Sequence, residues 1–369
     1  MSMDNPKVTV LMPVYNGEKY LRDAVLSILN QTFMDFEFLV INDGSTDKSL
    51  DLLKSFHDPR IRLVNNEINL RLPATLNKGL RLARGTYIAR MDCDDISLPE
   101  RLARQVEYLD ANPDVGLCST DIYSMNVHGQ VIDMPKDKIK GVPVEWRLFW
   151  ENPIKHPTAM LRRRILADSN LAYRDVFAED FVLWCRLALV TKIQKLDYPL
   201  LLYRMAPGSI FHSNPAPHFV QAITASRALA SIIGKTDCPA FHDDLTTFKS
   251  AMGEKPKVFQ LKWILTWVEF LLASSKAYWN WTESEHRLAR LDAQKRLYKY
   301  LKHFPTYYFQ YYLAIFTLGQ NRRPEYIHLQ YFYSFTKKRI KKIAKRLLKR
   351  LIKRPLKRLI KRIRRIPPS

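Results

Sequence analysis

The sequence has few glycines, few cysteines and no long apolar run. Only 11 of its 369 residues are glycine and 26% are charged, which excludes a fibrous or broadly disordered chain. Its four cysteines are scattered, with no CxxC pair and no zinc-ligand spacing, so we expect free thiols in a reducing compartment. The beginning of the chain lacks a signal-peptide pattern, and no stretch of about 20 apolar residues predicts an ordinary spanning helix.

Acidic residues are missing from one region. Between Lys337 and Arg365 there are 17 Lys and Arg and no Asp or Glu, whereas the whole chain carries a net charge of +23. Without this segment 42 basic and 36 acidic residues remain, a net charge of only +6. The basic tail therefore needs an explanation separate from that of the rest of the chain.

The first 215 residues alternate short apolar runs with amphipathic segments. This pattern predicts an α/β domain with a parallel sheet covered on both faces, whose ligands bind at the carboxyl ends of the strands. We expect a helical region at 216–335, rich in aromatic residues, and a polybasic tail at 336–369. The predicted strands are Val8–Pro13, Phe36–Asn42, Arg60–Asn65, Tyr87–Met91 and Val115–Ser119, and the predicted helices are Glu18–Gln31, Leu72–Ala83, Pro99–Asp110 and one after Ser45.

Polar segments follow the first two predicted strands. Tyr15 can stack on a nucleotide base, and Pro13 fixes the turn before it; a strand-ending turn with a core tyrosine is the alternative. After the second strand, Asp43 can accept a hydrogen bond from a pyrimidine N3–H. Ser45 is a good N-cap for the next helix, and capping can also account for Asp47. Capping does not explain Asp43.

Three carboxylates, Asp92, Asp94 and Asp95, directly follow the fourth predicted strand. They repel one another unless a cation is present. Oxygen ligands of this kind suit Mg²⁺ or Mn²⁺, which would keep open positions for phosphate oxygens. Cys93 is expected to pack as a small residue rather than to bind metal. The alternative is an acidic turn that caps the helix beginning at Pro99.

A second acidic pair, Glu179 and Asp180, begins a predicted helix whose next turns are apolar. A carboxylate at a helix N-terminus can simply answer the helix dipole, and this explains one member of the pair. The other is then free to act as a general base.

In order and spacing these motifs resemble the family 2 glycosyltransferases, over residues 8 to about 205. The resemblance implies the GT-A fold, a Rossmann-like nucleotide-sugar-binding domain. It also implies an inverting hexosyltransferase that uses a nucleotide sugar as donor and Mn²⁺ or Mg²⁺ as cofactor. The expected donor is a UDP-sugar. The motifs are VLMPVYNGEKYL, FLVINDGSTDKS, LNKGLRLARGTYIARMDCDD, LPERLARQ, KHPTAMLRR, EDFVLWCR and LLYR.

The resemblance also implies roles for single residues in donor binding. Pro13, Tyr15 and Asp43 would hold the base of the donor. Asp92 would contact the ribose or the metal, and Asp94 would be the main protein ligand of the metal.

By the same resemblance Asp180 is the catalytic base, and His156 falls where relatives have a histidine near the sugar or the phosphates, a role that stays open here. Two departures affect the donor site. Arg71 stands where many relatives have glycine, so the donor loop is expected to differ. Ala206 stands where relatives often have a metal-binding histidine, for which His212 is a substitute or else an ordinary surface residue. The QxxRW motif of processive synthases is absent, so we expect transfer of one or a few sugars per encounter.

The tail alternates basic and apolar pairs from Lys341 to Arg362. Each half is amphipathic if helical, and Pro355 can kink the chain so that both apolar faces meet one plane. Basic amphipathic helices lie on anionic membranes, where each basic residue contributes about 1 kcal/mol. We therefore expect a cytoplasmic protein bound peripherally to the inner face of a membrane. A solvated tail and nonspecific nucleic-acid binding are the alternatives, and regular Leu and Ile interleaving disfavours both.

The expected partners are a nucleotide-sugar donor, a glycan or glycolipid acceptor and the membrane surface, without a specific nucleic acid. The acceptor is expected to be a lipid-linked glycan in cell-surface polysaccharide assembly. Two alternatives remain: a transferase that acts on protein or a soluble glycan, and a nucleic-acid-binding protein with a degenerate transferase fold. Intact Asp43, Asp92, Asp94 and Asp180 disfavour the last.

Overall fold

The structure, a computed structural model, describes residues 5–133, 141–205 and 258–301, with five helical residues at 225, 228, 229, 232 and 233. The chain divides into two compact units, Met1–Tyr300 and Leu301–Ser369. The basic tail at 336–369 and both predicted domain boundaries, at 215 and 335, lie outside the described residues. Those predictions therefore stay predictions.

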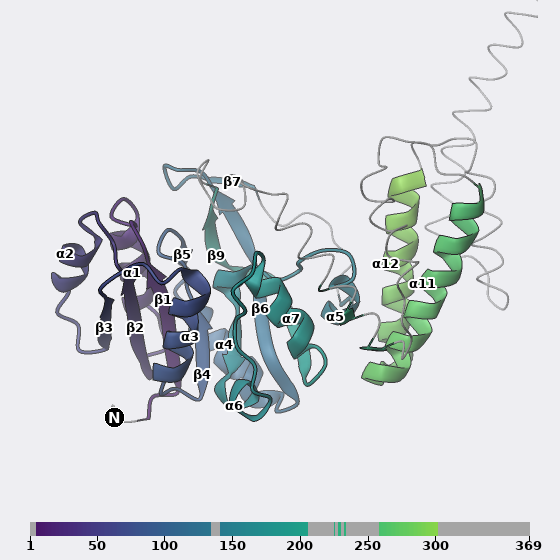
Figure 1. Cartoon of the computed structure of the whole chain (residues 1–369), viewed down its shortest axis with the longest axis horizontal. Coiled ribbons are helices and arrows are strands. Elements are labelled where there is room, and N and C mark those ends of the chain that lie inside the picture. The colour runs from purple at the N-terminus through teal and green to yellow at the C-terminus, as the bar shows by residue number, and fades with distance from the viewer. Residues whose placement is uncertain are drawn as a thin grey trace, which may run out of the picture. The chain divides into compact units, whose positions relative to one another are not determined.

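The described strands form a nine-stranded sheet in the order β3-β2-β1-β4-β8-β6-β9-β5, with β7 paired to β6 (Figure 1). β1, β2, β3 and β4 are parallel, as predicted, and so are β6 and β9. The strands are β1 (Val8–Val14), β2 (Phe36–Asp43), β3 (Ile61–Asn66), β4 (Tyr87–Arg90), β5 (Ile96–Ser97), β6 (Val115–Met125), β7 (Val131–Asp133), β8 (Met160–Arg162) and β9 (Lys192–Arg204).

The prediction of a wholly parallel sheet is wrong, because β8 is antiparallel to both β4 and β6, and β5 is antiparallel to β9. A parallel connection needs a crossover of a dozen or more residues, usually a helix. The described residues between β6 and β8 contain helices of only four and three residues. The regular alternation of strand and helix therefore ends at β6, and the sheet becomes mixed.

The helices begin later than the sequence pattern predicts near the site. α1 begins at Leu21 and α2 at Ser49, because the residues before them form loops at the strand ends. The described helices are α1 (Leu21–Leu29), α2 (Ser49–Lys54), α3 (Leu72–Leu82), α4 (Arg101–Ala111), α5 (Val144–Arg147), α6 (Arg163–Asp168), α7 (Glu179–Leu187), α11 (Val258–Trp279) and α12 (Glu283–Leu301), with a 3₁₀ turn at His156–Thr158. Within the described part of the chain, no helix is long and apolar enough to cross a membrane.

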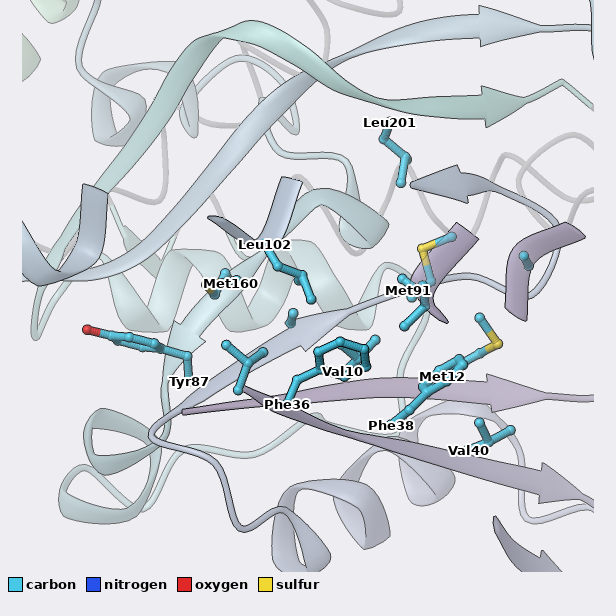
Figure 2. Close-up of a cluster of buried hydrophobic side chains, with 14 of the residues drawn as sticks. Val10, Met12, Phe36, Phe38, Val40, Tyr87, Met91, Leu102, Met160 and Leu201 are labelled. Atoms are coloured by element: carbon cyan, nitrogen blue, oxygen red, sulfur yellow. The ribbon is translucent and has the colours of Figure 1, made fainter. Parts of the chain in front are cut away.

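Alternate residues of β1 face opposite sides of the sheet. Val10 and Met12 point into the core shown in Figure 2, to which α1 and α4 contribute buried residues such as Leu102. On the other face α3 contacts β1 and β2, and its Gly79 lies directly against the Leu11 side chain. Helices therefore cover both faces of this part of the sheet, as predicted, and the pairing between its strands sets their register.

That register brings the polar strand ends together. Val14 of β1 lies opposite Asn42 of β2, and Leu11 lies opposite Arg90 at the end of β4. Because these strands are parallel, the segments that follow them emerge at the same edge of the sheet.

Candidate active site

The segments after β1 and β2 are hydrogen-bonded to each other, with backbone N–H groups of one donating to side-chain oxygens of the other. These bonds satisfy backbone donors that no strand or helix pairs. The bonds are Asn16 N to Ser45 Oγ (3.0 Å), Gly17 N to Ser49 Oγ (2.9 Å), Glu18 N to Asp47 Oδ2 (3.0 Å), Thr46 N to Asn16 Oδ1 (2.8 Å) and Lys48 N to Glu18 Oε2 (2.8 Å).

This arrangement corrects the prediction for Ser45. Its hydroxyl does not cap α2, which begins four residues later, but accepts from Asn16. Asp47 does assist the start of α2, since its Oδ1 accepts from Ser49 N at 2.9 Å. The two loops thus form one rigid wall of the site.

Asp43 ends β2 and is 4% exposed. Its Oδ1 accepts from Asn66 Nδ2 at 2.7 Å and from Leu70 N at 3.0 Å, so it holds the loop that leads to α3. Gly44 follows with a φ of +66°, and a Cβ there would lie 2.6 Å from the Ile68 carbonyl carbon. Only glycine fits this close approach without strain.

Tyr15 and Pro13 differ in their placement. Tyr15 is 49% exposed directly after β1, in a position from which its ring can stack on a ligand. Pro13 is buried inside β1, in register with Ile41. The expectation that Pro13 fixes the turn is therefore wrong: the turn begins two residues later, and the ring packs within the sheet.

Arg71 occupies an unusual backbone conformation. It precedes α3 with φ 69° and ψ 157°, a region that is essentially restricted to glycine. Its N–H donates to Asn69 Oδ1 at 2.8 Å. A glycine at this position would adopt the same turn without strain.

The acidic turn after β4 gathers Asp92, Asp94 and Asp95, with one carboxylate oxygen of each lying within 4.8 Å of the others. Burial and the neighbouring Asp92 raise the pKa of Asp94 to about 6, and burial with both neighbours raises the pKa of Asp95 well above its usual value. Asp95 Oδ2 is buried without a hydrogen-bond partner. Such a group of carboxylates accommodates a divalent cation.

The acidic turn does not cap α4, which rules out the alternative interpretation, since the N-cap residue of α4 is Glu100. Cys93 packs against Gly17, as predicted for a small residue, since a Cβ on Gly17 would lie 3.0 Å from its Sγ. This contact also joins the acidic turn to the loop after β1.

Two buried arginines support the acidic turn. Arg204, the last residue of β9, donates its backbone N–H to Asp95 Oδ1 (2.8 Å) and its Nε–H to the Asp94 carbonyl (2.7 Å). Its guanidinium lies over the Tyr20 ring, 4.1 Å from the centroid. Arg90, at the end of β4, forms an ion pair with Asp92.

The second acidic pair begins α7, as predicted. The residue before it, Ala178, adopts a left-handed conformation (φ 52°, ψ 43°) that turns the chain into the helix. Burial and the adjacent Asp180 raise the pKa of Glu179 to about 7. Burial also raises the pKa of Asp180, whereas hydrogen bonds from Phe181 N–H and Asn152 oppose that rise. Asn152 Nδ2 donates to Asp180 Oδ2 at 2.9 Å.

His156 is buried beside this pair. Its Nε2 lies 2.8 Å from the Tyr173 hydroxyl and its Nδ1 lies 3.8 Å from Glu179 Oε1. Burial and the positive charge of Arg90 lower its pKa well below the usual value, so the imidazole is neutral at physiological pH. Its direct contacts are with Tyr173, Glu179 and the Trp184 ring.

Comparison with known proteins decides the family. The family model named Glycosyl transferase family 2 matches residues 9–170. An uncharacterised glycosyltransferase of Methanocaldococcus jannaschii is 34% identical over 209 residues, which are 55% of this chain and 72% of the relative. The chain belongs to glycosyltransferase family 2.

Other relatives of this glycosyltransferase include an O-antigen biosynthesis glycosyltransferase, WbnJ, of Escherichia coli. It is 33% identical over 187 residues, which are 49% of this chain and 71% of WbnJ. Among solved structures, S. aureus TarS residues 1–349 in complex with UDP-GlcNAc has a TM-score of 0.52 at 20% identity, covering 74% of this chain and 81% of that one. This likeness shows that the α/β domain has the GT-A type of fold.

The positive charge of Arg90 connects the two acidic groups of this family 2 glycosyltransferase. It pairs with Asp92 and also influences the pKa values of Asp94, Glu179 and Asp180. Arg90 therefore belongs to the site although its charge was not singled out from the sequence. The signal was available, since a basic residue inside an apolar strand is rarely buried without a partner.

Arg204 and Asn152 were also missed as site residues. Arg204 lies in the LLYR motif. This motif contributed to the family resemblance, but it did not indicate that Arg204 contacts the acidic turn. Asn152 has no signal in the sequence, because its role depends on a partner 28 residues away. Ala206 and His212, considered for the metal site, lie outside the described residues.

Proposed function

We propose that this glycosyltransferase transfers a sugar from a UDP-sugar to an acceptor hydroxyl with inversion at the anomeric carbon, and that the acceptor is a lipid-linked glycan of a cell-surface polysaccharide. The observation that carries the proposal is the presence of two acidic groups that both interact electrostatically with Arg90. One is a three-carboxylate cluster, and the other is a buried carboxylate pair at the start of α7.

The acidic turn fits a divalent cation. Asp95 Oδ2 is a buried oxygen without a partner, and the pKa of Asp94 is raised by burial and by repulsion from Asp92. We assign Asp94 and Asp92 as the protein ligands of Mn²⁺ or Mg²⁺. When bound, the cation supplies positive charge to the diphosphate leaving group. No protein acid is then required on that side of the reaction.

The acceptor side needs one base, which we assign to Asp180. A single carboxylate suffices to take the proton of the acceptor hydroxyl as it attacks the anomeric carbon from the face opposite the diphosphate. Asp180 accepts hydrogen bonds from Asn152 and from the backbone N–H of the next residue, Phe181. These bonds favour the ionised form that a base requires. We assign neutral His156, which contacts Glu179, a place near the sugar or the phosphates.

The donor wall supports a nucleotide base. Tyr15 offers an exposed ring, and Asp43 holds the loop that leads to α3 beside it. We assign Pro13, Tyr15 and Asp43 to the binding of this base. TarS binds UDP and UDP-GlcNAc on a domain of this fold, which supports a UDP-sugar as donor. The relative WbnJ is named for O-antigen biosynthesis, which supports a cell-surface glycan as acceptor.

The direct test is a screen of nucleotide sugars for Mn²⁺-dependent hydrolysis and for transfer to lipid-linked acceptors. We expect turnover with a UDP-sugar that chelation of the metal abolishes. Turnover only with a GDP-sugar would refute the donor assignment, and full turnover in EDTA would refute the metal.

The membrane part of the proposal rests on the basic tail. Deletion of Lys337–Ser369 should release the protein from anionic liposomes while its thermal unfolding transition stays in place. High salt should weaken attachment only partly, since screening acts on the Lys and Arg charges and not on buried Leu and Ile. Flotation of the truncated protein equal to that of the full chain would place the anchor elsewhere.

A further inference from the structure

The helical hairpin formed by α11 and α12 contacts two segments next to the candidate base Asp180: the one that contains Asn152, and the C-terminal end of α7. The first contact is an ion-pair network. Arg296 of α12 donates from Nη2 to Glu151 Oε1 at 3.1 Å, and the same oxygen accepts from Arg147 Nη2 at 2.7 Å. Burial alone would raise the pKa of Glu151, but Arg296 and Arg147 lower it to about 2, so its charge is fixed.

Glu151 directly precedes Asn152, the residue that donates to Asp180. The orientation of the Asn152 amide is defined, because its Oδ1 accepts from Ile154 N–H at 3.3 Å. A backbone N–H can only donate, so the amide nitrogen must be the atom that faces Asp180. Asn152 can therefore stabilise the Asp180 carboxylate but cannot accept a proton from it.

The second contact lies at the other end of α7. Trp279, the last residue of α11, donates its Nε1–H at 2.7 Å to the carbonyl of Ala188, the C-cap residue of α7. That carbonyl belongs to the last turn, where helix geometry leaves acceptors without an intrahelical partner. On α12, Asp292 Oδ2 accepts from Trp146 Nε1 at 3.1 Å, which ties the hairpin to the α5 segment as well.

From these contacts we propose that Asn152 is a positioning residue for the base Asp180, and that the α11–α12 hairpin holds Asn152 in place through Arg296 and Glu151. The inference rests on the proposed role of Asp180 and assigns a task to the helical region that follows the GT-A domain. Chemical activation of the acceptor is thereby linked to the docking of a separate helical element.

The charged groups that act on Asp180 are Glu179 on the same helix, Arg90 at the end of β4 and Lys155 before the 3₁₀ turn. All three remain in the variants below. A change in the Asp180 pKa can then be attributed to the Asn152 hydrogen bond.

The experiment measures the Asp180 pKa by NMR, in full-length protein labelled with ¹³C at the aspartate γ-carbon; the signal is identified by its loss in Asp180→Asn. In Asn152→Ala the carboxylate loses a donor, so its pKa should rise by about one unit. Asn152→Asp should raise it further by adding a like charge. Asn30→Asp, at the exposed end of α1, controls for added negative charge and should leave the pKa unchanged.

The role of the hairpin is tested by Arg296→Ala, which should raise the Asp180 pKa by less than Asn152→Ala does. Arg296→Lys keeps the positive charge, so its Asp180 pKa should lie close to that of the unsubstituted protein. Arg287→Ala removes an exposed arginine from the same helix and is the matched control. Mn²⁺-dependent affinity for UDP should stay within about twofold in all these variants, which is about 0.4 kcal/mol at 1.4 kcal/mol per tenfold change.

Three results would overturn the inference: an unchanged pKa in Asn152→Ala, a lower melting temperature without a pKa change in Arg296→Ala, or equal shifts in Arg287→Ala. Failure of the proposed function looks different. In that case Asp180→Asn would retain nucleotide-sugar turnover, whatever the pKa titrations give.

Discussion

The donor loops and the base helix are positioned over different sequence distances. The bonds between the loops after β1 and β2 join residues 29 to 32 positions apart. The supports of α7 come from Asn152, 28 positions away, from Trp279, 91 positions from Ala188, and from Arg296, 145 positions from Glu151. The two donor loops are therefore held by contacts over about 30 positions, whereas the helix that carries the candidate base also depends on the docking of α11 and α12.

The largest effect is expected from Asp94→Ala, which should abolish metal-dependent binding of nucleotide. The substitution removes the main proposed ligand from the three-carboxylate cluster. Calorimetry with UDP and Mn²⁺ is the measurement, and Asp168→Ala, an exposed acid at the end of α6, is the control. Unchanged metal-dependent affinity would contradict the assignment of the donor side.

Asp180→Asn should separate the two sides of the site. It should spare donor binding and reduce turnover by about 10² or more, the range for a removed general base. The comparison variant is Glu179→Gln, since Glu179 shares the helix start and has a raised pKa. If Glu179→Gln is inactive while Asp180→Asn turns over normally, the roles of the two acids are reversed.

Gly44→Ala should disturb the donor side alone. A methyl group there collides with the backbone at Ile68, beside the loop that Asp43 holds, and the positive φ adds strain. We expect a loss of about 1–3 kcal/mol of unfolding free energy. Gly129→Ala has a φ of +81° but open space around the methyl group, so it separates strain from collision. Equal losses in both variants would show that the close approach at Gly44 is unimportant.

The smallest effect, and the only favourable one, is expected from Arg71→Gly. Glycine adopts the observed backbone without strain, so the unfolding free energy should rise by about 1 kcal/mol after its greater unfolded-state entropy is subtracted. Arg71→Ala keeps the strain and removes the side chain, and it should not stabilise. A gain in both variants would mean that the arginine side chain, not its backbone, is unfavourable.

The difference between the two sides explains how much of the fold could be predicted. The strands β1 to β4 and helices α3 and α4 follow from apolar periodicity within single segments, and their predicted bounds are within two residues of those observed. The antiparallel β8 and the long β9 were not predicted. β8 has only three residues, too few to show a period, and β9 pairs with β6 along a register interrupted by irregularities.

The same limit applies to the site. Asp43, Asp92, Asp94 and the pair at the start of α7 stand in motifs directly after or before an element, so the sequence marks them. The contact of Asn152 with Asp180 could not be predicted from the sequence, because no periodic pattern relates the two positions. The strain at Arg71 also required the structure, although its departure from the family pattern pointed to that loop.

The position of Arg204 in the sequence has a consequence for folding during synthesis on the ribosome. It donates to Asp95 across 109 positions of sequence, so the acidic turn lacks this support until β9 has been synthesised. At synthesis rates of roughly 5 to 20 residues per second, that interval lasts on the order of 5 to 20 s. During it Asp95 lacks the backbone N–H donor that Arg204 supplies in the folded protein.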